Sequence, residues 1–370
     1  MKLLILMSDT GGGHRSAADA IAAALERLAP CSTVELLDFF STCAPFPLNQ
    51  AGAIYGPWVN FAAPLWGAGY HLTDGRRRAA LVVWMISLAT RRQVEAKVQA
   101  AQPDVLACVH PLATRLSADV RRRAGWAMPL ATIVTDLSTA HAAWFTRGVD
   151  LLVAPSEPVR KRAVESGIPG ERVFITGQPV HPRFTEIDSD QCTIRQSLGL
   201  DPERFTVLLI GGGEGMGRVA DMARAIDRAG LPVQQLVICG RNGALQRRLE
   251  RQSWRVPTHI FGFVRNMPTL MRAADVVATK AGPGTICEAL AVGRPILLTG
   301  YVPGQERGNV DFVVGAGAGQ LTETPQALIA ALQNLLNSGS QAQQERMAEN
   351  ARRLAKPSAA WDIARLLLDL

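Results

Sequence analysis

The sequence predicts an α/β protein made of two parallel-sheet domains, and three observations support this prediction. Short apolar runs alternate with helical patterns along the chain, which is typical of parallel α/β units. The alternation stops at the proline-containing polar stretch Pro179–Asp190 and then begins again. The 370 residues, 48% hydrophobic and 19% charged, are enough for two buried cores.

The first half contains six strand candidates, each a short apolar run bounded by turn or helix signals. They are Lys2–Ser8, Thr33–Asp38, Asp104–His110, Leu130–Thr135, Leu151–Pro155 and Arg172–Thr176. An Ala-rich helix is expected over Ser16–Leu28, directly after the first strand. We therefore place the first domain at residues 1–185, and read Pro179–Asp190 as the linker.

The second half repeats the pattern, and we place the second domain at residues 186–355. Its expected strands are Phe205–Ile210, Gln235–Cys239, His259–Phe263, Val276–Thr279 and Pro295–Thr299. Residues 356–370 read as an amphipathic helix, which either crosses back to the first domain or simply ends the second. Ligands of parallel sheets bind beyond the carboxyl ends of the strands, so we expect loops of both domains to line a cleft.

Charge and cysteine content restrict the function classes. A net charge of +7 and a pI near 9.4 suggest an acidic partner, although a solvated basic face explains them equally well. The six cysteines form no CxxC pair, which predicts reduced thiols and neither a zinc site nor a disulfide framework. The apolar N-terminal run ends in glycines, as a first strand does, and no stretch is suited to crossing a bilayer.

One segment does not fit the α/β pattern. Between Asp38 and Asp74 there is no Asp, Glu, Lys or Arg, the segment includes aromatic residues such as Trp58, and Arg76–Arg78 follow. Aromatic rings beside a basic cluster are typical of a segment that contacts a membrane interface. The alternative is a hydrophobic loop that packs on its own domain.

A glycine-rich turn, SDTGGGHR (Ser8–Arg15), follows the first strand and begins a helix. Gly12 and Gly13 allow another group to approach the main chain, and a helix N-terminus favours negative charge. His14 is the unusual residue of this turn. A neutral histidine here can act as a general base, or it can cap the helix or bind phosphate without taking part in catalysis.

Two further motifs follow strands of the second domain. GGGEGMG (Gly211–Gly217) presents main-chain amides to an anion such as the β-phosphate of a nucleotide sugar. TKAGPGTICEA (Thr279–Ala289) and PGQERGN (Pro303–Asn309) together place Lys280, Glu288, Gln305 and Glu306 at one sheet edge. Lys280 can neutralise a diphosphate and Glu288 can accept two ribose hydroxyls, while Gln305 and Glu306 suit sugar hydroxyls. These residues predict a nucleotide-sugar site.

These motifs together resemble monogalactosyldiacylglycerol synthases over most of the chain. Three further motifs contribute to the resemblance: VTDLSTAHAAWF (Val134–Phe145), ICGRN (Ile238–Asn242) and GFVRNM (Gly262–Met267). The resemblance implies a GT-B fold, two Rossmann-like domains facing across a cleft. It also implies transfer of galactose from UDP-galactose to diacylglycerol, with inversion, at a membrane surface. More distantly, the chain resembles diacylglycerol glucosyltransferases and the N-acetylglucosaminyltransferase of peptidoglycan synthesis.

The resemblance also implies roles for individual residues. On the acceptor and membrane side they are His14, Asp136, His141, Gly12, Gly13, Trp58 and Trp144, the last touching the glycerol region of the lipid. On the donor side, Phe263 lies where main-chain groups read uracil, Glu288 binds ribose, and Gln305 and Glu306 bind the sugar. The diphosphate region and its surroundings are assigned to Gly213, Arg241, Lys280, Gly284 and Thr285.

We expect His14 to take the acceptor proton, with Asp136 orienting it or serving instead. Amides near Gly213 and Thr285, with Lys280, are expected to stabilise the leaving UDP, so no metal or other cofactor is expected. Asp188-Ser189-Asp190 has the form of a metal-binding DxD motif, but it falls in the predicted linker. Anionic membrane lipids are expected partners and nucleic acid is not; the expected location is peripheral, at the cytoplasmic face of the cell membrane.

Other functions stay open at this point. Glucose or N-acetylglucosamine can replace galactose, because galactose and glucose differ only in the orientation of one hydroxyl. A UDP-sugar epimerase shares the architecture but needs no lipid site. A nicotinamide oxidoreductase is disfavoured because neither half contains GxGxxG. A non-catalytic UDP-sugar sensor would not need His14 and Asp136.

Overall fold

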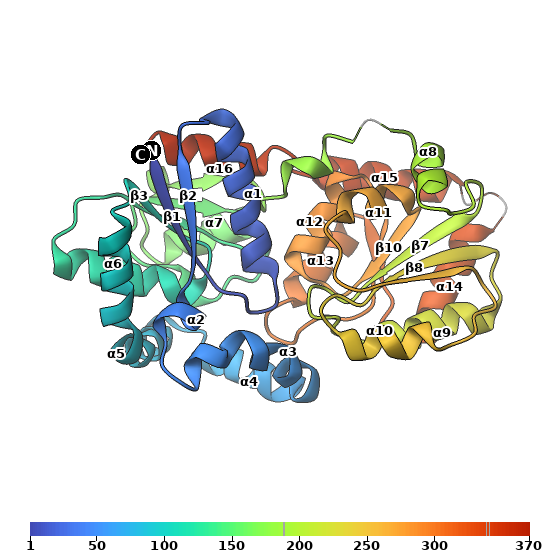
Figure 1. Cartoon of the computed structure of the whole chain (residues 1–370), viewed down its shortest axis with the longest axis horizontal. Coiled ribbons are helices and arrows are strands. Elements are labelled where there is room, and N and C mark those ends of the chain that lie inside the picture. Colours follow the sequence, from blue (N-terminus) through green and yellow to red (C-terminus); the bar gives the residue numbers. More distant parts are fainter. Residues whose placement is uncertain (188, 338, 340) are drawn as a thin grey trace. The chain divides into compact units, whose positions relative to one another are not determined.

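The computed structural model describes residues 1–187, 189–337, 339 and 341–370, except the side chains of Pro57 and Asn60. These residues form two compact units (Figure 1). Unit 1 comprises Met1–Pro182, Val302–Gly308 and Lys356–Leu370. Unit 2 comprises Arg183–Tyr301 and Asn309–Ala355.

Unit 1 is built on a parallel six-stranded sheet in the order β2-β1-β3-β4-β5-β6. The strands are β1 (Lys2–Met7), β2 (Thr33–Asp38), β3 (Val105–Cys108), β4 (Leu130–Ile133), β5 (Leu151–Ala154) and β6 (Val173–Ile175). Strands β3, β4 and β5 are buried at every position, because helices cover both faces of a parallel sheet. All six strands predicted from the sequence are confirmed.

Helices cover the two faces of this sheet separately. On one face α1 (Gly13–Leu28) packs beside α16 (Ala359–Leu368), and Leu25 and Leu367 share one buried cluster (Figure 1). The last helix of the chain therefore belongs to unit 1. Further helices of unit 1 are α5 (Arg76–Ala101), α6 (Pro111–Ala124) and α7 (Glu157–Glu165). Its later 3-10 turns are η2 (Ala142–Trp144), η3 (Gly170–Arg172) and η4 (Pro182–Phe184), the last spanning the unit boundary.

The uncharged segment after Asp38 is helical and not a loop. It forms α2 (Phe39–Cys43), η1 (Leu48–Gln50), α3 (Ala51–Phe61) and α4 (Ala63–Thr73). The Asp38 side chain caps α2 by accepting from the main-chain N–H groups of Phe40 and Ser41. Neither these helices nor the long α5 were predicted. Of the helices in the described ranges, none combines the length and the apolar character needed to cross a bilayer.

Unit 2 contains a second parallel six-stranded sheet, in the order β12-β11-β10-β7-β8-β9. Its strands are β7 (Phe205–Ile210), β8 (Val233–Ile238), β9 (Thr258–Phe261), β10 (Val276–Thr279), β11 (Ile296–Leu298) and β12 (Gly319–Leu321). The five predicted strands are confirmed. The edge strand β12 was missed because its sequence, Gly-Gln-Leu, is not an apolar run, unlike the equally short β6 and β11. Its helices are α8 (Gln191–Ser197), α9 (Val219–Ala229), α10 (Gly243–Glu250), α11 (Met267–Ala273), α12 (Pro283–Ala291), α14 (Pro325–Leu336) and α15 (Gln341–Leu354).

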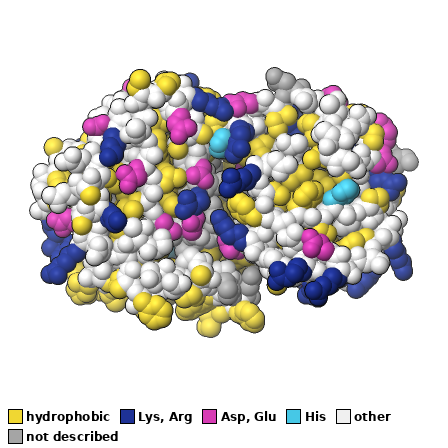
Figure 2. Space-filling model, in the orientation of Figure 1, with side chains coloured by type: hydrophobic (Ala, Val, Ile, Leu, Met, Phe, Trp, Pro, Cys, Tyr) yellow, Lys and Arg dark blue, Asp and Glu magenta, His cyan; other side chains and the backbone are white. Residues whose placement is uncertain are grey.

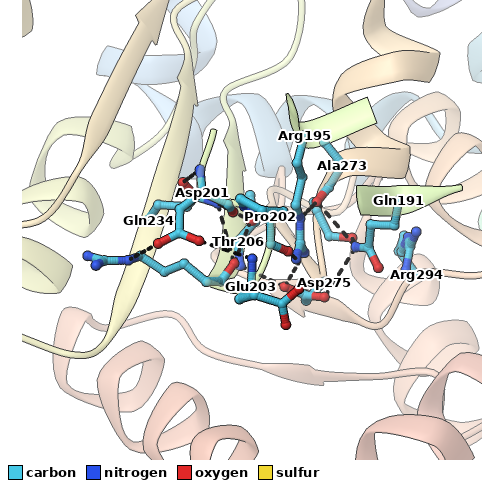
Figure 3. Close-up of polar contacts among 12 residues, drawn as sticks. Gln191, Arg195, Asp201, Pro202, Glu203, Thr206, Gln234, Ala273, Asp275 and Arg294 are labelled. Atoms are coloured by element: carbon cyan, nitrogen blue, oxygen red, sulfur yellow. Dashed lines mark hydrogen bonds and ion pairs between the residues drawn. The ribbon is translucent and has the colours of Figure 1, made fainter. Parts of the chain in front are cut away.

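A buried polar cluster attaches α8 to the amino ends of β7 and β10 (Figure 3). The guanidinium of Arg195 donates to Asp275 Oδ2 at 2.6 Å and to the carbonyl oxygens of Ala273 and Pro202, both at 2.8 Å. Asp275 also accepts from the main-chain N–H of Thr206 at 2.7 Å. Every charged atom of this ion pair thus has a partner, as a buried ion pair requires.

The compact units depart from the expected boundaries at Val302–Gly308, which was assigned to the second domain and clusters with unit 1. Two glycines allow the segment to pack closely against α4. Gly67 of α4 lies so near Pro303 that an added Cβ would be only 2.8 Å from it, and a Cβ added to Gly304 would be 3.2 Å from Tyr70. The helix α13 (Arg307–Gly315) begins in this segment and continues in unit 2.

Candidate active site

The first glycine turn brings His14 to the carboxyl end of the unit 1 sheet. Gly11 and Gly12 have φ values of 74° and 78°, a conformation that L side chains rarely adopt. The half-buried His14 ring places Nδ1 2.9 Å from the hydroxyl of Thr135, just beyond β4. One of its two ring nitrogens is therefore occupied.

Burial sets the protonation of His14. Desolvation lowers its pKa from 6.5 to about 4, and a hydrogen bond with the Val109 main chain offsets this only in part. The ring of His110 lies edge-on, with 4.6 Å between the ring centroids, and its own pKa is lowered by burial. His14 is consequently a neutral imidazole at neutral pH.

Asp136 follows Thr135 and is 6% exposed. Its Oδ2 accepts from Trp144 Nε1 at 2.7 Å, and its Oδ1 lies 3.4 Å from Gln305 Nε2. Burial raises the pKa of Asp136 from 3.8 to about 6, although hydrogen bonds from Trp144, Gln305 and the His141 main chain lower it. The structure thus holds a carboxylate that titrates close to neutral pH.

Trp144 lies in the interior of unit 1. Its side chain is 0% exposed, and its ring centroid is 6.2 Å from that of His14. The resemblance implies that Trp144 touches the glycerol region of the lipid. In the structure, however, the indole has no accessible surface, and its N–H group contacts Asp136.

The loop that carries His141 is anchored to α4. Asp74, which follows α4, accepts from the main-chain N–H of Ala142 at 2.9 Å and from Arg162 at 2.6 Å. Thr73 Oγ1 lies 3.3 Å from His141 Nε2. The Tyr70 hydroxyl donates to the carbonyl of Thr139 at 2.9 Å. These contacts position the residues on either side of His141.

Gln305 and Glu306 lie in unit 1, beside the acceptor-side residues. Glu306 is buried, and its carboxylate accepts from the main-chain N–H of Val302 at 2.8 Å. This contact closes the turn that presents Gln305 to Asp136. Tyr55 of α3 is close by: its ring would lie 3.0 Å from a Cβ on Gly11. Burial raises the pKa of Tyr55, and the charges of Glu306 and Asp136 raise it further.

The donor-side residues gather at one edge of the unit 2 sheet, after the neighbouring strands β10, β7, β8 and β9. The second glycine turn packs tightly there, since a Cβ on Gly240 would lie 2.4 Å from the carbonyl oxygen of Gly213. The Lys280 side chain reaches the same turn: its Cε would lie 3.6 Å from a Cβ added to Gly212. Close main-chain packing and a lysine are what a diphosphate site requires.

Two more donor-side groups complete this edge. Arg241 forms an ion pair with Glu214 at 2.6 Å and stacks over the Phe263 ring at 4.8 Å, where Phe263 is 56% exposed. Gly284 and Thr285 lie in the first turn of α12, and the half-buried Glu288 follows one turn later. The structure brings Gly213, Arg241, Phe263, Lys280, Gly284, Thr285 and Glu288 to one sheet edge.

Trp58 belongs to an exposed hydrophobic surface on α3, α4 and α5, which we name the apolar patch. Figure 2 shows hydrophobic side chains gathered at its lower left edge, where Figure 1 places these helices. Phe61 is the most exposed member, at 94%. With the loop residue Phe46, the patch comprises Phe46, Ile54, Trp58, Phe61, Leu65, Leu72, Leu81, Trp84, Met85 and Leu88.

The DxD-like sequence falls outside these two groups of residues. Asp188 lies outside the described residues. Asp190 caps α8, where its carboxylate accepts from the Thr193 main-chain N–H at 3.0 Å and the Thr193 hydroxyl at 2.6 Å. Asp190 thus has a structural role at the start of α8.

Comparison with known proteins identifies the family. Residues 14–180 match the monogalactosyldiacylglycerol (MGDG) synthase family, and residues 206–363 match the glycosyltransferase family 28 C-terminal domain. The chain is 38% identical over 372 residues to monogalactosyldiacylglycerol synthase 1 of Arabidopsis thaliana, covering 98% of this chain and 69% of that protein. The chain belongs to the MGDG synthase family. This confirms the resemblance found in the sequence, and the chain is a glycosyltransferase.

Solved structures place this MGDG synthase family member in the GT-B fold. MurG of Acinetobacter baumannii matches with a TM-score of 0.61 and 17% identity, over 100% of both chains. The UDP-GlcNAc 2-epimerase of Neisseria meningitidis matches with a TM-score of 0.63 and 16% identity, also over 100% of both chains. At these identities the likeness concerns the fold alone, which is the fold class predicted from the sequence.

Sequence reasoning missed several residues that shape the acceptor side. Thr135 contacts His14, and its position next to Asp136 was the available signal. Asp74 and Arg162 are paired although 88 residues separate them, and one sequence holds no signal for such a pair. The fold of α4 and α7 brings them together.

Proposed function

We propose that this chain transfers galactose from UDP-galactose to the free hydroxyl of 1,2-diacylglycerol, with inversion, at a membrane surface. The observation that carries the proposal is the 38% identity to an MGDG synthase over 98% of the chain. That match includes both the acceptor-side residues of unit 1 and the donor-side residues of unit 2. It also favours this reaction over UDP-sugar epimerisation, which has support only from the fold.

The donor edge of unit 2 suits UDP-galactose. Lys280, the second glycine turn and the N-terminus of α12 supply positive charge and N–H donors for the diphosphate. Glu288 provides a carboxylate for the ribose hydroxyls, and the main chain at Phe263 reads uracil. As the bond from C1 to the UDP oxygen breaks, these donors stabilise the charge that grows on UDP.

Two groups on the acceptor side compete for the role of base, and we assign it to Asp136. An efficient base has a pKa near the working pH, and the pKa of Asp136 is about 6. The pKa of His14 is about 4, and its Nδ1 is already in contact with Thr135. Asp136 Oδ1 takes the hydroxyl proton, the hydroxyl oxygen bonds to C1, and UDP leaves. His14 positions the hydroxyl as a neutral ring.

The apolar patch supports a peripheral membrane location. Its exposed rings and aliphatic side chains are of the kind that enters a headgroup region, and Arg76, Arg77 and Arg78 begin α5 beside them. Arginines next to an apolar surface favour anionic lipid headgroups. Diacylglycerol resides in such a membrane, and binding through the patch would bring unit 1 to the acceptor.

The test is to incubate the protein with liposomes that contain diacylglycerol and phosphatidylglycerol, and with labelled UDP-galactose or UDP-glucose. Labelled lipid from UDP-galactose alone supports the proposal. Labelled lipid from UDP-glucose alone would establish a glucosyltransferase instead. A changed UDP-sugar without labelled lipid would establish an epimerase. An unchanged donor would contradict the proposal and favour the non-catalytic UDP-sugar sensor.

A further inference from the structure

We propose that Trp144 is a positioning residue for Asp136: its indole N–H holds Oδ2 of the carboxylate and thereby directs Oδ1 to the acceptor hydroxyl. The inference rests on the proposed function, in which Asp136 is the base. It differs from the lipid-contact role that the resemblance implies for Trp144.

The geometry favours a polar role inside the protein. The indole is 0% exposed, and the distance from Nε1 to Asp136 Oδ2 is 2.7 Å, which is short for a neutral donor on a carboxylate. Trp144 ends the 3-10 turn η2, where its main-chain N–H donates to the carbonyl of His141 at 3.0 Å. This turn packs against α5 and α6, so the ring is held by the core of unit 1.

The rigid indole makes the two oxygens of the carboxylate inequivalent. Of the two side-chain contacts, that of Trp144 with Oδ2 is short, at 2.7 Å, and that of Gln305 with Oδ1 is longer, at 3.4 Å; the His141 main chain also hydrogen-bonds this carboxylate. The more weakly held oxygen is the one that can accept a proton from a substrate. Trp144 therefore sets which oxygen reacts and stops the side chain from rotating.

Trp144 also determines the charge state of Asp136 together with its other neighbours. Burial and the nearby Glu306 raise the pKa of Asp136, and hydrogen bonds from Trp144, Gln305 and the His141 main chain lower it. The hydroxyl groups of Tyr55 and Tyr70, which feel the charge of Asp136, are themselves neutral because burial raises their pKa values. Among the side chains that lower the pKa of Asp136, Trp144 has the largest effect.

The experiment compares the pH dependence of kcat/KM for Trp144→Phe and wild type. Loss of the N–H donor raises the pKa of Asp136, and the base must be deprotonated to work. The acid limb should therefore move upward by about one pH unit, so the activity ratio of variant to wild type should fall about fivefold between about pH 8 and about pH 6. If Trp144 bound lipid instead, KM for diacylglycerol would rise equally at all pH values and the limb would not move.

A direct titration of Asp136 tests separately whether Trp144 lowers the pKa of Asp136 and whether Asp136 is the base. The C=O stretch of its protonated carboxyl is followed by infrared difference spectroscopy, with Asp136→Asn to assign the band. A midpoint that shifts upward in Trp144→Phe together with the acid limb supports the inference. A shifted midpoint with an unmoved limb means that Trp144 tunes Asp136 but that Asp136 is not the base, which refutes the proposed mechanism and with it the catalytic part of the inference. An unmoved midpoint overturns the inference itself.

Two further variants keep the test interpretable. Trp66→Phe is the matched control, because the buried Nε1 of Trp66 has no hydrogen-bond partner among the residues described, so its removal should leave the acid limb in place. If Trp144→Phe fails to fold, benzothienylalanine at position 144 keeps the ring size and lacks only the N–H. It should show the same shift, and an unshifted limb and midpoint in this variant would overturn the inference.

Discussion

At the scale of single residues, His14 and Asp136 show how burial separates two titratable groups that lie within one site. Burial lowers the pKa of His14 to about 4 and raises that of Asp136 to about 6. The sequence could indicate both residues, since each follows a predicted strand. It could not rank them as bases, because burial and the contacts of Trp144 and Thr135 arise only in the fold.

Replacing Asp136 should lower the transfer activity and raise the stability of the fold. Asp136→Asn removes the proposed base, so we expect kcat to fall about 10²- to 10⁴-fold. The pKa of Asp136 is higher in the folded state than in the unfolded state, so its ionised form destabilises the fold as pH rises from about 4 to above 6. The variant should therefore gain about 3 kcal/mol of unfolding free energy relative to wild type at neutral pH, and little at about pH 4.

Denaturant unfolding at several pH values, together with the transfer assay, checks this prediction. Asp190→Asn is a suitable comparison, since Asp190 is an exposed cap and carries no proposed role in the reaction. Equal transfer rates for Asp136→Asn and wild type would rule out Asp136 as the base. A stability difference that does not change with pH would contradict the raised pKa.

At the scale of elements, apolar runs predicted the strands well and the helices less well. Six of six strands in unit 1 and five of six in unit 2 were expected, because buried parallel strands read as continuous apolar runs. The 26 residues of α5 were missed because apolar side chains lie on its exposed face, with Leu81, Trp84, Met85 and Leu88, as well as on its buried face, with Val83 and Val94. Apolar residues on both faces weaken the helical periodicity on which the prediction depends.

The ion pair beneath α8 leads to a prediction about stability. In Arg195→Met the Asp275 carboxylate loses its buried cationic partner, so unit 2 should lose about 3–5 kcal/mol of unfolding free energy. Arg353→Met is the matched control, because the ion pair of Arg353 with Glu349 is exposed and should contribute less than about 1 kcal/mol. Urea unfolding followed by circular dichroism measures both. Equal losses in the two variants would contradict the structural role of the Arg195 cluster.

At the scale of the whole molecule, the two-unit GT-B organisation was predictable, whereas the assignment of Val302–Gly308 was not. The segment follows β11 of unit 2 in the sequence, and contacts such as those of Pro303 with Gly67 and of Gly304 with Tyr70 join it to unit 1. Those contacts depend on glycines far away in the sequence. The sequence therefore indicated Gln305 and Glu306 as site residues but placed them in the other unit.

The apolar patch leads to a prediction about membrane binding. Phe61→Ser should weaken binding to vesicles of phosphatidylcholine and phosphatidylglycerol about tenfold or more, because a buried phenyl ring contributes about 2 kcal/mol. Folding stability should not change, since the ring is 94% exposed in the free protein. Val314→Ser removes an exposed apolar side chain from unit 2 and is the control. Vesicle sedimentation measures both, and equal binding of Phe61→Ser and wild type would remove Phe61 from the contact surface.

The reaction itself is tested most directly by the anomeric proton of the lipid product. Protein, UDP-galactose and diacylglycerol-containing vesicles are incubated together, and the extracted lipid is examined by proton NMR. UDP-galactose carries the sugar in α-linkage, so inverting transfer to diacylglycerol predicts a single β-linked galactose on the glycerol hydroxyl. An α-linked galactose, a sugar other than galactose, or no glycosylated lipid would contradict the assignment.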